Sequence, residues 1–495
     1  MEVRTRGAAV CLSMGLMLSC GDDVVTAELA EVCGQASPVR LLELGADELP
    51  LANLGAIRKV GDRLYFTVGP RERVDTGGIS LPWYGHPATS TVYSTGLCGE
   101  DRVEIARDVW SVFSDERTPG LVLGCRGSGA NLNAPSSFDL VALDPEGVSA
   151  PRLLIPAAGC FGAGWTDYGV VVTESLGEEV ERVLLYPYPA DLEAAPIDPI
   201  VLLEAVSSSH WRIETGADEV LAVNLDDELV RVDLSDGSTS VLEVGVGSFQ
   251  VSPSGRYVQW FPPSAGEDLA APVYLLDRET GVTHLLAEAA LDRSWGFVRD
   301  DYTVLDVVEP EFHQRLVSLR TFSAVDLPPD RRLVARVDEG RWITSSSWFL
   351  SPYQLRDLAS GAETTLLDAD GVNASMGAEA LNALLVPFNS PATGELQRIP
   401  YDGGPPQVLA RRATAGYLEL ADGRVVSPVD LDADSLGALV LVDPDTLEEQ
   451  QIDDRVYAPV GHYNQEALFG ADVVTYAVSD GARSGVYLAR LAPRR

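Results

Sequence analysis

Short apolar runs separated by turn residues fill most of this chain, and they are clearest between Phe249 and Leu286. There an aromatic-led run reaches a turn at Pro253-Ser254-Gly255, and a later run ends at Asp277 before a turn at Glu279-Thr280-Gly281. Apolar runs with turn residues about every 8–12 positions are typical of β-sandwiches and β-propellers. The pattern therefore predicts strands joined by tight turns.

The same rhythm recurs along the chain, and each recurrence starts at one leading residue. The leading residues are Ile57, Trp110, Trp165, Trp211, Phe249, Trp295, Trp342, Met376, Tyr417 and Tyr463. Their mean spacing is about 45 residues, which is the length of a four-stranded propeller blade. We therefore expect an all-β protein, a β-propeller of around ten such units, arranged as one large ring or as two smaller rings.

The two ends of the chain complement each other. The last unit has apolar runs at 471–478 and 485–491 and then stops, whereas an extra run at 39–44 precedes the first unit. We expect this N-terminal run to be a strand that completes the last blade. Such closure covers strand edges that would otherwise pair with other chains.

One unit carries a recognisable motif. Residues 252–258 read Ser-Pro-Ser-Gly-Arg-Tyr-Val, and residues 277–281 read Asp-Arg-Glu-Thr-Gly. This unit resembles a repeat of the TolB-type propellers, in which Ser-Pro-Asp-Gly precedes one strand and Asp-x-x-Thr-Gly follows the next. Ser254 stands where that family has aspartate. The resemblance implies WD-type propeller blades. It covers one unit by motif and the others by rhythm.

The N-terminal segment has the features of an export signal. Arg4 and Arg6 precede an apolar run at 7–19 that is too short to cross a bilayer, which takes about 20 residues. Met17-Leu18-Ser19-Cys20 resembles the bacterial lipobox, whose cysteine receives lipid. We expect a lipoprotein signal peptide at 1–19, a lipidated flexible tether at 20–36 and the propeller at 37–495. The alternative is an ordinary signal peptide cleaved near Ala27 or Ala30.

Four further cysteines lie in the first third of the exported chain: Cys33, Cys98, Cys125 and Cys160. Four cysteines in an exported protein favour two disulfides, with three possible connectivities. We expect the pairs Cys33–Cys98 and Cys125–Cys160, because neighbouring repeats are the nearest contacts. Buried free thiols are the alternative. A zinc site is disfavoured because no C-x-x-C pair occurs.

The charge balance excludes some partners. The chain has 74 acidic and 36 basic residues and a formal net charge of −38. Such a surface repels nucleic-acid phosphates and anionic lipid headgroups, and it keeps an exported protein in solution. Lys59 is the single lysine, so a P-loop is excluded and Schiff-base chemistry would depend on this residue alone.

The motifs of the common enzyme classes do not occur. The sequence contains no G-x-S-x-G elbow and no H-E-x-x-H pair. His210, just before Trp211, is the histidine best placed near the mouth of a propeller channel. Asp430, Asp432 and Asp434 begin like a calcium loop, but Ser435 and Leu441 replace the glycine and glutamate that such a loop needs. We interpret them as a solvated turn.

The leading tryptophans have two interpretations, which are stacking on a sugar in the channel or packing between neighbouring blades. Packing is the commoner role of large aromatic residues at repeated positions, and we expect it here.

These observations predict a lipid-anchored propeller in the bacterial cell envelope, facing the periplasm or lying on the cell surface. We expect a binding or scaffolding module without a cofactor, with a protein or glycan partner and no nucleic acid. The alternative is an envelope hydrolase or lyase, possibly acting on a glycan, with its site in the propeller channel. A purely structural envelope protein is a third possibility.

Overall fold

A computed structural model describes most of the chain from residue 38 onwards. The described residues are 38–45, 48–50, 57–70, 74–75, 80–81, 90–114, 122–128, 137–155, 164–177, 180–187, 198–207, 213–216, 218–263, 270–291, 296–298, 300–308, 311–338, 340–347, 350–368, 383–387, 395–411, 413, 417–420, 422–430, 432, 436–457 and 473–491. The predicted signal peptide and tether lie outside this set.

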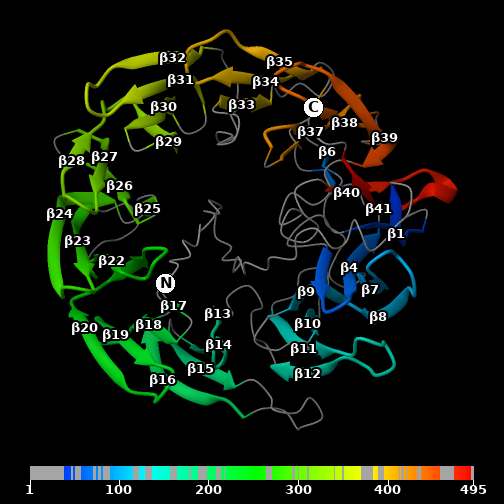
Figure 1. Cartoon of the computed structure of the whole chain (residues 1–495). Coiled ribbons are helices and arrows are strands. Elements are labelled where there is room, and N and C mark those ends of the chain that lie inside the picture. The colour runs from blue at the N-terminus through cyan, green and yellow to red at the C-terminus, as the bar shows by residue number, and fades with distance from the viewer. Residues whose placement is uncertain are drawn as a thin grey trace, which may run out of the picture. The chain divides into compact units, whose positions relative to one another are not determined.

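The described chain is nearly all β and forms two compact units (Figure 1). Unit 1 contains the described residues of 158–332. Unit 2 contains those of 22–157 and 333–495, so it joins the two ends of the described chain. A short 3₁₀ helix, η2 (Gly481–Arg483), is the one helix in the described part of the chain, and no helix there is long and apolar enough to cross a bilayer.

Unit 1 is built from antiparallel sheets whose strands follow chain order, four to a blade. The first is β13 (Gly164–Trp165), β14 (Gly169–Gly177), β15 (Val180–Pro187) and β16 (Ile200–Ser207). The second is β17 (Ile213–Thr215), β18 (Glu219–Val223), β19 (Glu228–Asp233) and β20 (Thr239–Val244). An eight-stranded sheet continues with β21 (Ser248–Val251), β22 (Tyr257–Phe261), β23 (Ala270–Asp277), β24 (Val282–Leu291), β25 (Gly296–Val298), β26 (Tyr302–Val307), β27 (His313–Ser318) and β28 (Ala324–Asp326).

Unit 2 repeats the same design. Its N-terminal part has β2 (Glu48–Pro50), β3 (Ile57–Val60), β4 (Arg63–Pro70), β7 (Thr91–Gly96) and β8 (Val103–Arg107), the small pair β5 (Val74–Asp75) and β6 (Ser80–Leu81), then β9 (Val109–Ser114), β10 (Val122–Ser128), β11 (Ser137–Leu143) and β12 (Arg152–Ile155). Its C-terminal part has β29 (Arg332–Arg336), β30 (Arg341–Ser347), β31 (Leu350–Asp357) and β32 (Glu363–Leu367), then β33 (Ala383–Pro387), β34 (Glu395–Pro400) and β35 (Gln407–Arg411). These in-order antiparallel sheets are propeller blades, and the predicted fold class is confirmed.

The last sheet joins the two ends of the described chain. It contains β36 (Leu418–Glu419), β37 (Val425–Val429), β38 (Leu436–Val442), β39 (Glu449–Tyr457), β40 (Val473–Val478) and β41 (Gly485–Arg490), and β1 (Val39–Glu43) is added at its end. Strand β1 pairs antiparallel with β41, and the two lie side by side in Figure 1. The predicted completion of the last blade by an N-terminal strand is therefore confirmed.

A recurring turn joins the third and fourth strands of several blades, and the blade of the TolB-like motif shows it best. Asp277 ends β23, its carbonyl oxygen accepts from the amide of Gly281, and its carboxylate accepts from the amide of Glu279. Gly281 has a φ of 69°, a left-handed value that glycine adopts without cost. Arg256 at the start of β22 also binds the Asp277 carboxylate through two hydrogen bonds of 3.1 and 2.8 Å. The motif thus fixes where two strands begin and end.

The hydrophobic core lies between neighbouring sheets, so both faces of most sheets are buried. One cluster joins Leu221 and Val223 of β18 to Phe249 of β21 and Trp260 of β22. Another joins Leu42 of β1 to the sheet of β4. Because both faces are buried, the strands appear in the sequence as short continuous apolar runs. They lack the alternation of apolar and polar residues that identifies a half-buried strand.

One predicted register position is wrong. The aromatic rhythm predicts that Trp342 leads its blade, but it lies in β30, the second strand, and β29 is the leading strand. Its side chain is buried, at 2% exposure, as the packing interpretation requires. Aromatic residues pack between blades from any strand of a sheet that is buried on both faces, so an aromatic residue alone does not mark the leading strand. Trp211, Trp295, Met376 and Tyr463 lie outside the described residues, and the number of blades and rings stays a prediction.

Candidate functional site

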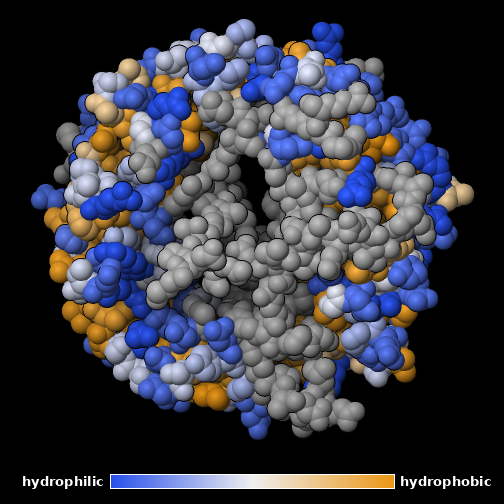
Figure 2. All heavy atoms as spheres, in the orientation of Figure 1, coloured by the Kyte–Doolittle hydropathy of each residue, from blue (hydrophilic) through white to orange (hydrophobic). Residues whose placement is uncertain are grey.

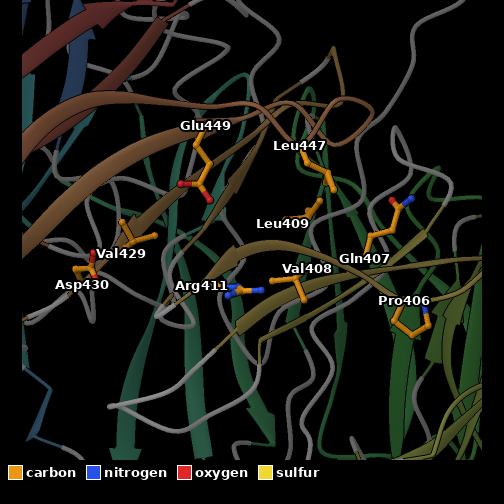
Figure 3. Close-up of a pocket in the computed structure, with 9 residues that line it drawn as sticks. All are labelled: Pro406, Gln407, Val408, Leu409, Arg411, Val429, Asp430, Leu447 and Glu449. Atoms are coloured by element: carbon orange, nitrogen blue, oxygen red, sulfur yellow. The ribbon is translucent and has the colours of Figure 1, made fainter.

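An open pocket lies between two neighbouring blades of unit 2, with a volume of about 620 Å³. It is lined by Pro406, Gln407, Val408, Leu409, Arg411, Val429, Asp430, Leu447 and Glu449 (Figure 3). Strand β35 supplies one wall, and the end of β37 with the turn from β38 to β39 supplies the other. We call it the β35/β39 pocket.

A bulge in β35 sets how the first wall presents its side chains. The register between β34 and β35 shifts between Leu396 and Gln397, which places Leu409 opposite no single residue. Consequently Leu409 and Ala410 are both buried, at 2% and 0% exposure, although they are consecutive. They pack against Val425 and Val442 of the next blade. A bulge re-aims the neighbouring side chains, and here Arg411 points out of the core.

The opposite wall is held by a turn that a neighbouring arginine binds. Leu447 donates its amide to the carbonyl oxygen of Asp443 at 2.8 Å and has a φ of 57°. Arg398 of β34 contacts the carbonyl oxygen of Pro444 at 3.4 Å and the carboxylate of Asp445 at 3.3 Å. The turn is thereby tied to the neighbouring blade. The side chain of Leu447, at 46% exposure, forms part of the pocket lining.

The pocket contains charged groups that the fold does not use. Within the described part of the chain, the side chains of Arg411 and Glu449 form no ion pair or hydrogen bond, and both are exposed. In Figure 3 they extend into the pocket from different strands, with the apolar side chains of Val408 and Val429 nearby. A guanidinium, a carboxylate and apolar groups on two rigid blades are suited to holding a polypeptide segment or another small polar ligand. The lining includes no histidine, cysteine or serine that could act as a nucleophile or proton carrier.

A different feature of unit 1 has acid–base character. Glu214 lies on β17, the first strand of its sheet, and pairs with Leu221 across the sheet. Desolvation by the surrounding protein raises the pKa of its carboxyl to about 7. A carboxyl that is half protonated near neutral pH can exchange a proton with a substrate. His210 lies outside the described residues, so its distance from Glu214 is not defined.

The cysteines predicted to form disulfides are only partly within the described chain. Cys98 follows β7, and its amide donates to the Glu100 carboxylate at 2.9 Å. Cys125 is fully buried in β10. Cys20 and the expected partners Cys33 and Cys160 lie outside the described residues, so lipidation and both pairings stay predictions.

The run of aspartates that resembles the start of a calcium loop stabilises a turn. Asp432 accepts from the amide of Leu436 at 3.0 Å and forms an ion pair with Arg455 at 2.8 Å. Among the described residues, no cluster of three or more histidine, cysteine or acidic side chains is arranged to hold a metal ion. Asp434 lies outside that set.

Sequence reasoning missed both the β35/β39 pocket and Glu214. The pocket residues come from three strands and the three connections beside them, and Asp430 alone belongs to a pattern noted in the sequence, the start of a calcium-like loop. The only local signal is Arg411 at the end of the run Gln-Val-Leu-Ala-Arg, and a run that ends in Ala-Arg also forms β8, where Arg107 binds Glu104 at 2.7 Å. Glu104 lies three residues before Arg107 in the same strand, whereas Val408 stands three residues before Arg411, so this difference is already present in the sequence.

No protein-family model matches the chain, and no curated protein matches it. Solved structures with similarity include TolB from Acinetobacter baumannii, at 14% identity over 58% of this chain and 77% of that chain, with a TM-score of 0.25. Oligogalacturonate lyase from Vibrio parahaemolyticus has 11% identity over 56% of this chain and 87% of that chain, with a TM-score of 0.28. Tricorn protease has 11% identity over 88% of this chain and 46% of that chain, with a TM-score of 0.27. At this level of similarity the fold class rests on the sheets of the chain itself.

Proposed function

We propose that the protein is an exported, lipid-anchored β-propeller that binds a partner in the bacterial cell envelope. The observation that carries the binding function is the β35/β39 pocket, in which Arg411 and Glu449 are exposed beside apolar side chains and have no structural partner among the described residues. A rigid frame that presents uncommitted charges costs little reorganisation when a ligand binds. The anchor at Cys20 and the boundaries 1–19, 20–36 and 37–495 are part of this proposal, and their support is the lipobox-like sequence.

The test compares the full chain with two charge-reversal variants in native membranes. Arg411→Glu changes the pocket, and Arg107→Glu makes the same change at the matching position of β8, where the arginine is already paired. Chemical cross-linking followed by purification and mass spectrometry should recover a reproducible partner with the wild type and with Arg107→Glu. Recovery with Arg411→Glu should fall by about tenfold or more, because a guanidinium that binds a partner carboxylate contributes on the order of 1–3 kcal/mol.

Two results would contradict this proposal. Equal recovery with all three proteins would remove the pocket as the binding site. Recovery of the wild-type protein alone would remove the binding function. The anchor is tested in the same membranes, since Cys20→Ala should release the protein into the soluble fraction.

Glu214 favours a second candidate, an envelope hydrolase or lyase, because a carboxyl with a pKa of about 7 suits a general acid or base. A panel of envelope glycans and peptides would be assayed for turnover with the wild type, with Glu214→Gln and with Glu174→Gln, an exposed carboxylate of β14. Turnover that is lost only with Glu214→Gln would support the enzyme and displace the binding module. The absence of turnover on the whole panel would count against the enzyme.

A further inference from the structure

The β35/β39 pocket contains two opposite charges that do not pair with each other. Arg411 ends β35 on one wall and Glu449 begins β39 on the other, and Figure 3 shows both side chains extending into the pocket. Neither side chain takes part in an ion pair or hydrogen bond within the described chain, so their charged ends are too far apart to bind each other. The pocket therefore presents a cation and an anion that a ligand lying between them could join.

The other arginines of these two blades show that Arg411 is an exception. Among the described residues of 395–457, every other arginine has a carboxylate partner, and the pairs are Arg398–Asp445 at 3.3 Å, Arg424–Asp422 at 2.6 Å and Arg455–Asp432 at 2.8 Å. Arg411 has none there, although the chain has 74 acidic residues for 36 basic ones. In a chain so rich in carboxylates, an arginine left without one in a pocket is available to a ligand.

Blade packing fixes the separation of the two strands that carry these charges. Leu409, two residues before Arg411, is buried in one cluster with Val442 of the next blade. The turn before Glu449 is held from the first blade by Arg398, which donates to its backbone at 3.4 Å. Because both walls are held by contacts away from the pocket, they keep their places without a ligand. A ligand with matching charges therefore binds with little reorganisation of the protein.

Apolar groups lie beside the charged ones, and the pocket is elongated. Val408 lies on the wall of Arg411, and Leu447, at 46% exposure, lies on the wall of Glu449 (Figure 3). Figure 2 shows both blue, hydrophilic and orange, hydrophobic residues on the part of the surface where Figure 1 places β35 and β39. The lining follows β35 along 406–411, which is the length of an extended segment of about five or six residues rather than of a single amino acid.

The charge of the whole chain distinguishes ligands of one sign from ligands of both signs. The formal net charge of −38 repels a purely anionic ligand from Arg411 at long range. A purely cationic ligand would cover Arg411 and leave its guanidinium without water or an acceptor, which is unfavourable. A ligand with one group of each sign has no net charge to be repelled, and it complements both walls.

We propose that the β35/β39 pocket binds a zwitterionic polypeptide segment, in which one acidic and one basic side chain flank apolar residues. The acidic group accepts hydrogen bonds from the guanidinium of Arg411, and the basic group donates to the carboxylate of Glu449. The apolar residues between them contact Val408 and Leu447. This inference rests on the proposed binding function and gives the chemistry of the partner. It makes Glu449 a second determinant of binding beside Arg411.

The test is a double-mutant cycle between protein and peptide. The full chain, purified from membranes in detergent, is titrated with labelled peptides whose ends are capped, and binding is followed by fluorescence anisotropy. One peptide contains Glu-Val-Val-Lys between glycines, and two relatives have glutamine in place of the glutamate or of the lysine. The protein variants are Arg411→Gln and Glu449→Gln. The matched control is Glu448→Gln, since Glu448 is exposed next to Glu449 and lies outside the pocket lining.

We expect the peptide with both charges to bind the wild type about tenfold or more tightly than either relative does. Glu449→Gln should weaken this peptide by about tenfold and should not weaken the peptide without lysine. Arg411→Gln should likewise leave the binding of the peptide without glutamate unchanged, and Glu448→Gln should bind all three peptides as the wild type does. Equal losses with Glu448→Gln and Glu449→Gln would mean that general negative charge attracts the lysine, and they would overturn the proposal. So would failure of the peptide with both charges to bind.

Cross-linking in native membranes separates this inference from the proposed function. A partner that is lost with Arg411→Glu and retained with Glu449→Gln would overturn the zwitterionic ligand and leave the binding module intact. A partner that is lost with both variants and retained with Glu448→Gln would support the zwitterionic ligand. Absence of any partner with the wild type would contradict the binding module, and the peptide titration would then decide the chemistry of the pocket by itself.

Discussion

The outer, fourth strands of the blades differ between the two units. In unit 1 the strands β16, β20 and β24 carry exposed valine, isoleucine or leucine side chains together with glutamates, and they contain no lysine or arginine. In unit 2 the corresponding strands β1, β8, β12, β35 and β39 each contain an arginine, and β32 is the exception. The outer strands of the blades therefore differ in charge between the two units, although the blades share one architecture.

The arginines of unit 2 are mostly held by carboxylates. Arg40 binds Glu43 at 3.4 Å, and Arg107 binds Glu104 at 2.7 Å. Paired charges along an edge discourage other chains from adding to it, at little gain in stability because exposed ion pairs contribute about 0–1 kcal/mol. The contrast indicates that unit 2 places paired arginines and carboxylates on its outer strands, whereas unit 1 carries glutamates there, such as Glu243, which accepts a hydrogen bond from Thr283 of the next blade.

The largest expected change is in the free energy of unfolding, and it distinguishes a substitution in a buried outer strand from one in an exposed outer strand. Leu42 of β1 is 2% exposed and packs in the core that joins β1 to β4, whereas Ile200 of β16 is 51% exposed. Leu42→Asp should lower the free energy of unfolding by about 4 kcal/mol or more, because it buries an unpaired charge. Ile200→Asp should change it by less than about 0.5 kcal/mol. Urea unfolding of both variants checks this, and comparable losses would mean that β1 does not hold the last blade closed.

The next prediction concerns the pH dependence of the free energy of unfolding, and it compares one carboxyl of each unit. Desolvation raises the pKa of the half-buried Glu214 in unit 1 to about 7. In unit 2, Asp453 is 8% exposed, lies against Arg483 and accepts a hydrogen bond from Tyr476 at 2.9 Å. A carboxyl whose folded pKa is raised stabilises the fold only while it is protonated, so its contribution is full below the unfolded value and is lost as the pH rises through about 7.

Glu214→Gln should therefore gain stability relative to the wild type as the pH rises. The gain at about pH 8 should exceed the gain at about pH 4 by up to about 3 kcal/mol, with most of the change between pH 4.5 and about 7. Thermal unfolding across this pH range measures it. Glu174→Gln, at an exposed carboxylate that is paired with Arg182, is the control and should show no such trend. A gain that does not depend on pH would mean that Glu214 titrates normally.

The smallest effect compares the recurring turn in the two units. The position with left-handed φ is Gly281 in unit 1 and Leu447 in unit 2, at 69° and 57°. Leu447→Gly should stabilise the fold by about 0.5–1 kcal/mol, because a left-handed conformation costs a non-glycine residue about 1–2 kcal/mol and glycine loses part of that gain in entropy. Gly281→Leu should have the opposite effect, since its Cβ would meet no atom within 4 Å and backbone strain alone would act. The midpoints of urea unfolding test both variants. A lower midpoint for Leu447→Gly would mean that the leucine side chain stabilises the turn by contacts.

The sequence by itself determined the repeating unit of this protein and the way its last blade is completed. Both depend on local chemistry: the turn from Asp277 to Gly281 closes on itself through hydrogen bonds between residues two and four positions apart. The missing strand of the last unit and the extra run at 39–44 could be matched because strand pairing is obligatory for backbone groups.

Tertiary structure alone decided the register of Trp342, the β35/β39 pocket and the environment of Glu214. Trp342 was misplaced because both faces of its sheet are buried, which removes the alternation that would identify a strand by its pattern. Arg107 has Glu104 three residues before it and Arg411 has Val408 there, so the pairing of Arg107 is local, whereas the pocket beside Arg411 is lined by residues of three strands. Burial and pocket shape depend on residues far apart in the chain, so short-range patterns do not encode them.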